Sequence, residues 1–177
     1  KMYLFDPSDA SKEPRILADR NYQDVYSDPG DIVTKKNAFN RRVINMVDGN
    51  LFMMGDGFSE KGQFPFVDKM DLKSLKKERV YESSYTNKLE NLYSALDMKK
   101  GEILIRIESQ TEYPNYYKRN IYKKNKLTPM TFFENPYKSL QGIDKEVISY
   151  KRDDGLDLEG TLYLPVGYDK AKKEKMP

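Results

Sequence analysis

Short runs of apolar, β-branched and aromatic residues alternate with short polar segments that favour turns along most of this chain. Residues 2–5 and 15–18 read as two short strands, and the turn signal Ser27-Asp28-Pro29-Gly30 follows them. Two series of strand-like runs come next, at residues 32–36, 42–47, 50–55, 65–72 and 78–83, and then at 90–97, 102–109, 115–122 and 127–133. Runs of this length bounded by Gly, Asn, Asp and Lys are typical of strands. The pattern predicts an all-β fold.

The two series resemble each other. Asp48-Gly49-Asn50-Leu51-Phe52 matches Lys100-Gly101-Glu102-Ile103-Leu104 at an offset of 100 − 48 = 52 residues, and Phe64-Pro65-Phe66 matches Tyr113-Pro114-Asn115 at 113 − 64 = 49. A repeat of this length with four short strands suits a β-propeller blade, which buries its faces only against neighbouring blades. Chance similarity between two meanders is the alternative. We expect a partial β-propeller of about two four-stranded antiparallel blades, with earlier blades before Lys1.

The pattern changes after Asn135-Pro136-Tyr137. Two alternating runs flank Asp153-Asp154-Gly155, which predicts a β-hairpin with a tight turn. A two-stranded hairpin does not bury an apolar face alone, so we expect it to belong to a domain that continues past Pro177. The predicted division is therefore residues 1–136 for the blades and 137–177 for a linker and this hairpin. Only residues 72–78 and 94–100 have a helix-favouring composition, and both segments are short enough to be turns.

Composition supports thin layers rather than a thick helical core. Of the 177 residues, 38% are hydrophobic and 33% are charged, and the aromatic residues are 14 Tyr and 8 Phe. Such rings suit half-buried pleated surfaces. The formal net charge is only +3, which gives little support to nucleic-acid binding.

Histidine and cysteine are both absent. Their absence removes the usual general base, the thiol nucleophile and the two commonest zinc ligands from this segment. No serine lies in a Gly-x-Ser-x-Gly elbow. We expect no catalytic residue, no cofactor site and no metal site here. No apolar run approaches the roughly 18 residues of a membrane span, and the start Lys1-Met2-Tyr3 lacks the apolar core of a signal peptide. The start at Lys1 also suggests a cut N-terminus.

Four motifs have both a chemical and a structural interpretation. Gly55-Asp56-Gly57 resembles a phosphate cradle, but no helix pattern follows it, so a loop between strands is favoured. Asp153, Asp154 and Asp157 resemble a calcium loop but lack the spacing of an EF-hand, so a hairpin turn is favoured. The run from Lys170 to Lys175 is expected to be a solvated face.

The fourth motif interleaves aromatic and basic side chains, as in platforms that bind single-stranded nucleic acid. On strands, we expect alternation to place the rings on one face and the charges on the other, which is ordinary sheet construction. A structural role in the sheet is therefore favoured over nucleic-acid binding for these residues. The set comprises Tyr113, Tyr116, Tyr117, Lys118, Arg119, Tyr122 and Lys123.

The hairpin segment resembles a known family. Its pattern is similar to the segment of prolyl-oligopeptidase-type serine peptidases in which the chain leaves the β-propeller and begins the α/β-hydrolase domain. The matching positions are Tyr150, Arg152, Asp154-Gly155, Leu158, Gly160, Leu162-Tyr163-Leu164-Pro165 and Gly167-Tyr168. Residues 16–30 and 108–122 are similar to blades of the glutamyl endopeptidase-like branch and of many bacterial secreted peptidases. The resemblance thus covers nearly the whole chain.

The resemblance implies a serine peptidase whose propeller covers the active site and filters substrates by size. The Ser, Asp and His of its triad would lie beyond Pro177, so this segment would be inactive alone, and export to the periplasm or outside the cell is expected by analogy. Its partners would be the remaining blades, the hydrolase domain and a peptide substrate, with no nucleic acid or membrane, and exposed edges would favour self-association. The alternatives are a stand-alone module that binds carbohydrate or peptide, and an assembly component without a ligand.

Overall fold

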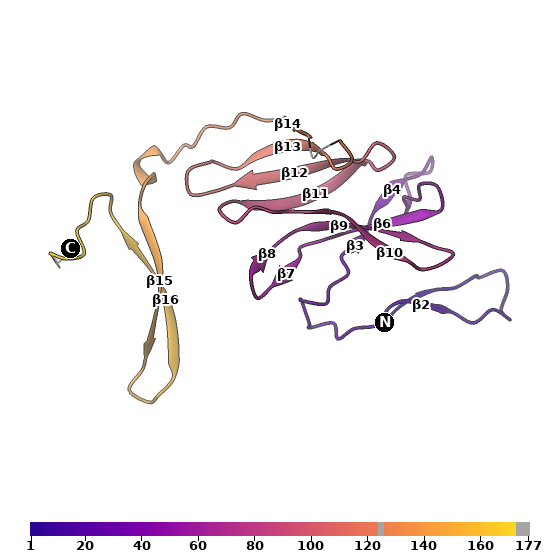
Figure 1. Ribbon diagram of the computed structural model, residues 1–177, viewed down its shortest axis with the longest axis horizontal. Coiled ribbons are helices and arrows are strands. Elements are labelled where there is room, and N and C mark those ends of the chain that lie inside the picture. Colours follow the sequence, from indigo (N-terminus) through magenta and orange to yellow (C-terminus); the bar gives the residue numbers. More distant parts are fainter. Residues whose placement is uncertain (124–125, 173–177) are drawn as a thin grey trace. The chain divides into compact units, whose positions relative to one another are not determined.

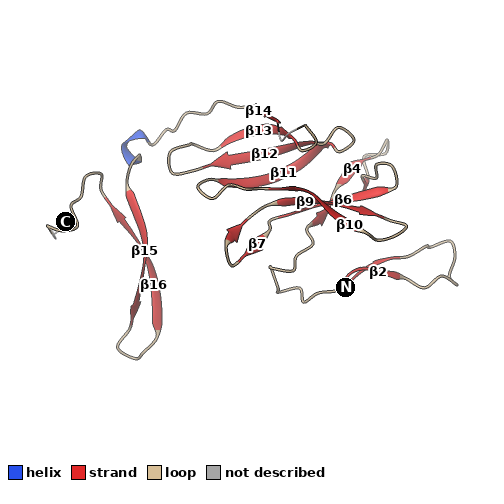
Figure 2. Cartoon of the chain, in the orientation of Figure 1, coloured by secondary structure: helices blue, strands red, loops and turns tan. Residues whose placement is uncertain are grey.

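The computed structural model describes residues 1–123 and 126–172. These residues divide into two compact units, which are described separately below. The first comprises residues 1–109 and 114–133, and the second comprises residues 110–113 and the chain from 134 onward. Nearly all regular structure is strand, as Figure 2 shows, so the predicted all-β class is confirmed. The assignment of residues 1–136 and 137–177 to a propeller and a hydrolase domain stays a prediction.

The first unit contains two four-stranded antiparallel sheets, each built from strands in chain order (Figure 1). One sheet has the order β10-β9-β6-β3 and is formed by β3 (Asp31–Ile32), β6 (Asn50–Gly55), β9 (Phe66–Asp71) and β10 (Lys77–Glu82). The other has the order β11-β12-β13-β14 and is formed by β11 (Leu89–Asp97), β12 (Glu102–Glu108), β13 (Asn115–Asn120) and β14 (Lys126–Pro129). We call these the first and second sheets.

Three small hairpins accompany the two sheets. They are β1–β2 (Met2–Leu4, Arg15–Ala18), β4–β5 (Thr34–Lys36, Arg42–Ile44) and β7–β8 (Phe58–Ser59, Gly62–Gln63). The second hairpin corrects the prediction of one strand over residues 32–36. Val33 separates β3 from β4, because its N–H donates to the carbonyl of Phe52 while its own carbonyl accepts from Asn45. The strand predicted over residues 127–133 is also shorter than expected and ends at Pro129.

The sequence repeat has a counterpart in the structure. Gly49 precedes β6 and Gly101 precedes β12, which are the second strands of their sheets, and both glycines have positive φ, at 78° and 71°. Phe64-Pro65 and Tyr113-Pro114 likewise precede the third strands, β9 and β13. The matched segments therefore occupy equivalent positions in two similar meanders.

Strand alternation builds the main core of the first unit. Ile103, Ile105 and Ile107 of β12 share one face because successive side chains point to opposite sides of a strand, and all three are buried. They form one cluster with Phe52 and Val67 of the first sheet. The two sheets therefore pack against each other through their apolar faces, and this burial is the main source of stability in the unit.

The opposite face of the first sheet has a smaller core. Leu51, Met53 and Met70 are buried there, and Leu17 of β2 packs against them. The first sheet is thus covered on both faces within this unit, since β12 lies on one side and β2 on the other. Six-residue strands such as β6 read as nearly continuous apolar runs for this reason.

The second unit contains the hairpin of β15 (Asp144–Lys151) and β16 (Asp157–Leu164), with a short 3₁₀ helix, η1 (Lys138–Leu140), before it. Ile148 pairs with Gly160 and Tyr150 with Leu158, which places these residues on one face. The predicted turn is present, and Gly155 within it has a φ of 85°. Within the described ranges, no helix has the length and apolar character needed to cross a membrane.

Candidate functional site

The most tightly connected polar group in the first unit is a buried network between the two sheets. Arg119 of β13 donates from Nε to Oε1 of Glu90 at 2.9 Å, and Tyr81 of β10 donates from its hydroxyl to Oε2 of the same carboxylate at 2.7 Å. Arg119 also donates to the hydroxyl of Tyr85 at 3.3 Å. Glu90 and Arg119 are both buried. The charge on each is compensated by the other, as burial of ions requires.

The environment of this network changes two pKa values. Burial raises the pKa of Tyr81, and the negative charge of Glu90 raises it further. Burial acts to lower the pKa of Arg119, but the negative charge of Glu90 and the hydrogen bond to Tyr85 act against it, so that this pKa is raised. The guanidinium also lies 5.1 Å from the centre of the Tyr81 ring. Both groups are therefore held in their ordinary protonation states, which suits a structural connection rather than proton transfer.

A second buried charge lies on β9. Asp68 is 1% exposed and pairs with Arg79 at 2.5 Å and with Lys77 at 3.0 Å, both from β10. The guanidinium of Arg79 also lies 3.8 Å from the centre of the Phe66 ring. The same ring fills the space next to Gly55, where an added Cβ would lie 2.5 Å from Cζ of Phe66. The arrangement fixes the β9–β10 edge of the first sheet.

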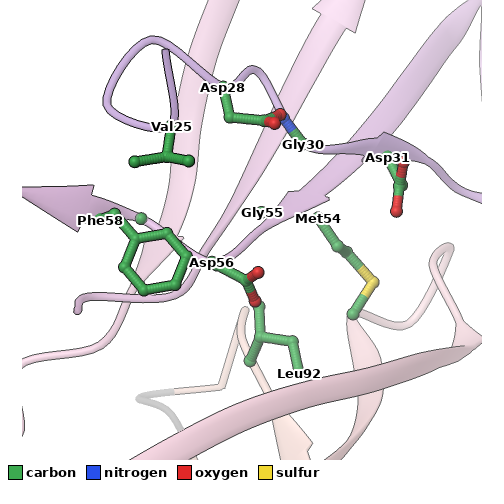
Figure 3. Close-up of a pocket in the computed structure, with 10 residues that line it drawn as sticks. Val25, Asp28, Gly30, Asp31, Met54, Gly55, Asp56, Phe58 and Leu92 are labelled. Carbon is green, nitrogen blue, oxygen red and sulfur yellow. The ribbon is translucent and has the colours of Figure 1, made fainter. Parts of the chain in front are cut away.

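A cleft of about 260 Å³ opens beside the loop that follows β6 (Figure 3). Asp28, Asp31 and Asp56 line it together with the apolar side chains of Met54 and Leu92. Figure 3 shows the carboxylate of Asp56 on the side of Leu92, whereas Asp28 turns toward Gly30. Asp28 accepts a hydrogen bond from the Gly30 N–H at 2.8 Å and pairs with Arg20 at 2.6 Å. Asp31 and Asp56 form no ion pair within the part of the chain that the structure describes.

Gly55-Asp56-Gly57 forms the connection between β6 and β7, as the loop interpretation predicts. Gly57 has a φ of 65°, and a Cβ there would lie 1.9 Å from the carbonyl oxygen of Phe64. The N–H of Phe64 in turn donates to the carbonyl of Gly57 at 2.9 Å. Glycine is thus required by a closed turn, and the loop leads into a strand rather than into a helix N-terminus.

The interleaved aromatic and basic residues do not divide as the sequence analysis expected. Residues two apart share a face of β13, so Tyr117 lies with Arg119 toward the core and Tyr116 lies with Lys118 on the other face. The expectation of rings on one face and charges on the other was wrong, because the order Tyr-Tyr-Lys-Arg gives each face one ring and one cation. Lys118 pairs with Glu102 at 3.2 Å.

The remaining members of this set lie outside β13. Tyr122 follows the strand and is partly exposed. Within β13, the ring of Tyr116 packs edge-on against the ring of Tyr93, with centroids 5.3 Å apart. Tyr113 belongs to the second unit. Within β13, the set is divided between the two faces of the strand and does not form one platform.

Two of the three acidic residues of the predicted hairpin motif, Asp154 and Asp157, are paired with neighbouring cations. Arg152 pairs with Asp154 at 2.5 Å, and Lys151 pairs with Asp157 at 3.0 Å. The hydrogen bonds from Arg152 lower the pKa of Asp154. No cluster of three or more acidic side chains suited to a metal ion occurs in residues 1–123 and 126–172. Lys170 is exposed and pairs with Glu146 at 2.6 Å, whereas residues 173–175 of the predicted lysine-rich face lie outside the described ranges.

Neither Tyr81 nor Glu90 belongs to a motif that predicts a functional site. The sequence held one signal that Glu90 has a buried partner. Glu90 shares its strand face with the apolar Leu92, and a charged residue on the buried face of a strand requires a partner of opposite charge. The identity of that partner was not readable, since Arg119 lies 29 residues further along the chain.

No family model matches this chain. Over its whole length, it is 35% identical across 190 residues to a protein of Oryza sativa subsp. japonica named probable glutamyl endopeptidase, chloroplastic. It is 34% identical across 191 residues to a protein of the same name from Arabidopsis thaliana. The chain spans 20% of the length of each relative. It is thus similar to a segment of proteins named as peptidases, and because both are plant proteins, they give no support to a bacterial origin.

A solved structure of a variant of the isopeptidase AtxE2 with Astexin3-dC4 bound is also similar. The match covers 69% of this chain and 18% of that chain, with 15% sequence identity and a TM-score of 0.36.

Proposed function

We propose that this chain is the non-catalytic part of a serine peptidase of the prolyl-oligopeptidase type, in its glutamyl endopeptidase-like branch. The observation that carries the proposal is the similarity to two proteins named glutamyl endopeptidase, which extends over 100% of the chain at 34–35% identity. The two stacked four-stranded meanders support it, because a propeller is built from such sheets. In this proposal residues 1–136 belong to the propeller and residues 137–177 begin the hydrolase domain.

The proposed role is to scaffold and gate an active site that other residues of the same polypeptide supply. The chain has no histidine and no cysteine, so a Ser-His-Asp triad would require residues from elsewhere. The buried network around Glu90 suits a scaffolding role, because it connects the two neighbouring sheets. Its partners would be further blades, the hydrolase domain and a peptide substrate. Export from the cytoplasm remains part of the proposal by analogy.

A comparison of two proteins tests this proposal. The 177-residue chain and the complete polypeptide encoded by its gene are each assayed with a fluorogenic peptide that has glutamate before the scissile bond. A matched peptide with glutamine is the control. We expect turnover of the glutamate peptide by the complete polypeptide, its loss after treatment with a serine-directed inhibitor, and no turnover by the 177-residue chain alone.

Inhibitor-sensitive turnover by the purified 177-residue chain would contradict the non-catalytic role. A complete polypeptide that lacks a Gly-x-Ser-x-Gly elbow and cleaves neither peptide would contradict the peptidase assignment. That second outcome would favour a stand-alone module that binds carbohydrate or peptide, for which exposed rings such as Tyr22 and Tyr93 would offer contacts.

A further inference from the structure

A groove runs along β11 in the first unit, between the edge strands of the two sheets. The cleft beside Asp56 adjoins a second cleft of about 290 Å³, and both are lined by Asp31, Met54 and Leu92. The second cleft adjoins a third of about 560 Å³, and both are lined by Thr34 and Ala95. Shared lining residues make the three clefts one continuous groove.

The backbone edges of two strands line this groove. The second cleft is lined by four consecutive residues of β11, 92–95, and by residues 31–34, which run from β3 through Val33 to the first residue of β4. β11 and β3 are each the end strand of their sheet, and residues of both line this cleft. In the described part of the chain, β11 pairs only with β12 and β3 only with β6. Both edges that face the groove therefore lack a strand partner.

The chemistry of the groove differs between its ends. At the end shown in Figure 3, Asp31 and Asp56 are exposed, and the nearby Asp28 is already paired with Arg20. Leu92 and Met54 supply apolar surface beside these carboxylates. A segment that lies here would meet backbone groups on its edges and apolar contacts on alternate side chains. At one end it would meet two carboxylates without an ion pair among the described residues, whereas Arg42, which lines the second cleft, donates to the hydroxyl of Thr34 at 3.1 Å.

We propose that this groove binds an extended peptide segment carrying a basic residue. The peptide adds to the free edge of β11 by backbone hydrogen bonds, as in other cases of strand addition, and its basic side chain lies between Asp31 and Asp56. β-Bulges in the pairing of β11 near Tyr93 and Leu96 interrupt the edge, so the bound stretch is short, about four residues. The inference depends on the groove alone and goes beyond the proposed peptidase role.

The test is equilibrium binding by fluorescence polarisation with the full 177-residue chain. The probe is a fluorescein-labelled hexapeptide of alternating valine and threonine with one central lysine, and the matched control has glutamate in place of lysine. We expect saturable binding of the lysine peptide and about fivefold or greater weakening with glutamate, because exposed charge pairs are each worth a modest factor. The double variant Asp31→Asn, Asp56→Asn should weaken the lysine peptide similarly. Asp153→Asn, which makes a charge change in the hairpin unit, should leave its affinity unchanged.

A second measurement tests strand addition itself and needs no protein variant. Single N-methyl groups are placed along the lysine peptide, one position at a time, to remove one backbone donor each. Strand addition predicts weakening of roughly fivefold at alternate positions only, because successive N–H groups of a strand point to opposite edges. Uniform or absent effects of N-methylation would overturn the strand addition. Absence of saturable binding, or equal binding to the wild type and the Asp31, Asp56 double variant, would overturn the site.

Discussion

Arg119 of β13 and Glu90 of β11 form an ion pair with an Nε to Oε1 distance of 2.9 Å, although their side chains are only 6% and 0% exposed. The second oxygen of Glu90 accepts the hydroxyl proton of Tyr81, which belongs to the other four-stranded sheet. One carboxylate thus connects three strands from two sheets. Loss of this carboxylate should therefore weaken the packing between the sheets as well as the second sheet itself.

Removal of one member of the pair should be strongly destabilising. We expect Glu90→Gln and Arg119→Met each to lower the free energy of unfolding by about 3–5 kcal/mol, because each leaves a buried charge without its partner. The double variant Glu90→Leu, Arg119→Leu should lose less than either single variant. Urea denaturation measures all three. Glu102→Gln, which breaks the partly exposed pair with Lys118, is the control and should cost no more than about 1 kcal/mol. Equal small losses at both pairs would contradict the prediction.

Tyr81→Phe should change the dependence of stability on pH. Burial and the charge of Glu90 raise the pKa of Tyr81 in the folded state, whereas in the unfolded chain this hydroxyl ionises near pH 10. The contribution of Tyr81 is therefore present below about pH 10 and is lost as the pH rises further, by up to about 1.4 kcal/mol per pH unit. Urea denaturation between about pH 8 and pH 11 should show a steeper decline for the wild type than for Tyr81→Phe. Parallel curves would count against this assignment.

Two glycines with similar backbone angles should respond differently to alanine. Gly57 has a φ of 65°, and the carbonyl oxygen of Phe64 occupies the position that an added Cβ would take. Gly49 has a φ of 78°, and no atom lies within 4 Å of an added Cβ there. Gly49→Ala should cost about 1–2 kcal/mol from its left-handed conformation alone. Gly57→Ala should cost clearly more, since the backbone of the turn must move. Thermal unfolding of both variants measures the difference, and equal midpoints would show that the turn relaxes freely.

Hydrogen exchange should differ between the two units. Ile103 and Ile105 of β12 are completely buried and lie in a central strand, whereas β15 and β16 form an isolated two-stranded sheet with Val147 and Tyr163 largely exposed. A two-stranded hairpin is marginally stable in water, and local opening exposes its amides readily. Mass spectrometry should find slow exchange in residues 102–108 and fast exchange in residues 144–151. Equal protection in both segments would contradict this expectation.

Strand positions followed from the sequence because the period-two pattern and the turn residues act locally. The central strands β6, β9, β12 and β13 lie within the predicted runs, and Gly49 and Gly101 mark the turns before β6 and β12. The predicted strand boundaries were wrong where a hydrogen bond to a distant part of the chain competes with the local preference for an extended strand. Val33 interrupts the run 32–36, since its backbone bonds to Phe52 and Asn45 rather than to one continuous partner strand.

The all-β class and the Asp-Gly hairpin turn were readable from the order of residues alone, because each depends on neighbours a few positions apart, and the repeat near 50 residues was readable because two such local patterns recur. The partners of the buried charges and the groove along β11 were not. Glu90 meets Tyr81 and Arg119 from positions 9 and 29 residues away, and the groove forms where two separate sheets place their edge strands. Strand alternation assigns each side chain to one face of its sheet, but it does not say which surface packs against that face. Only the packing of the two sheets therefore decides which buried charged side chains form pairs and which strand edges remain without a partner strand.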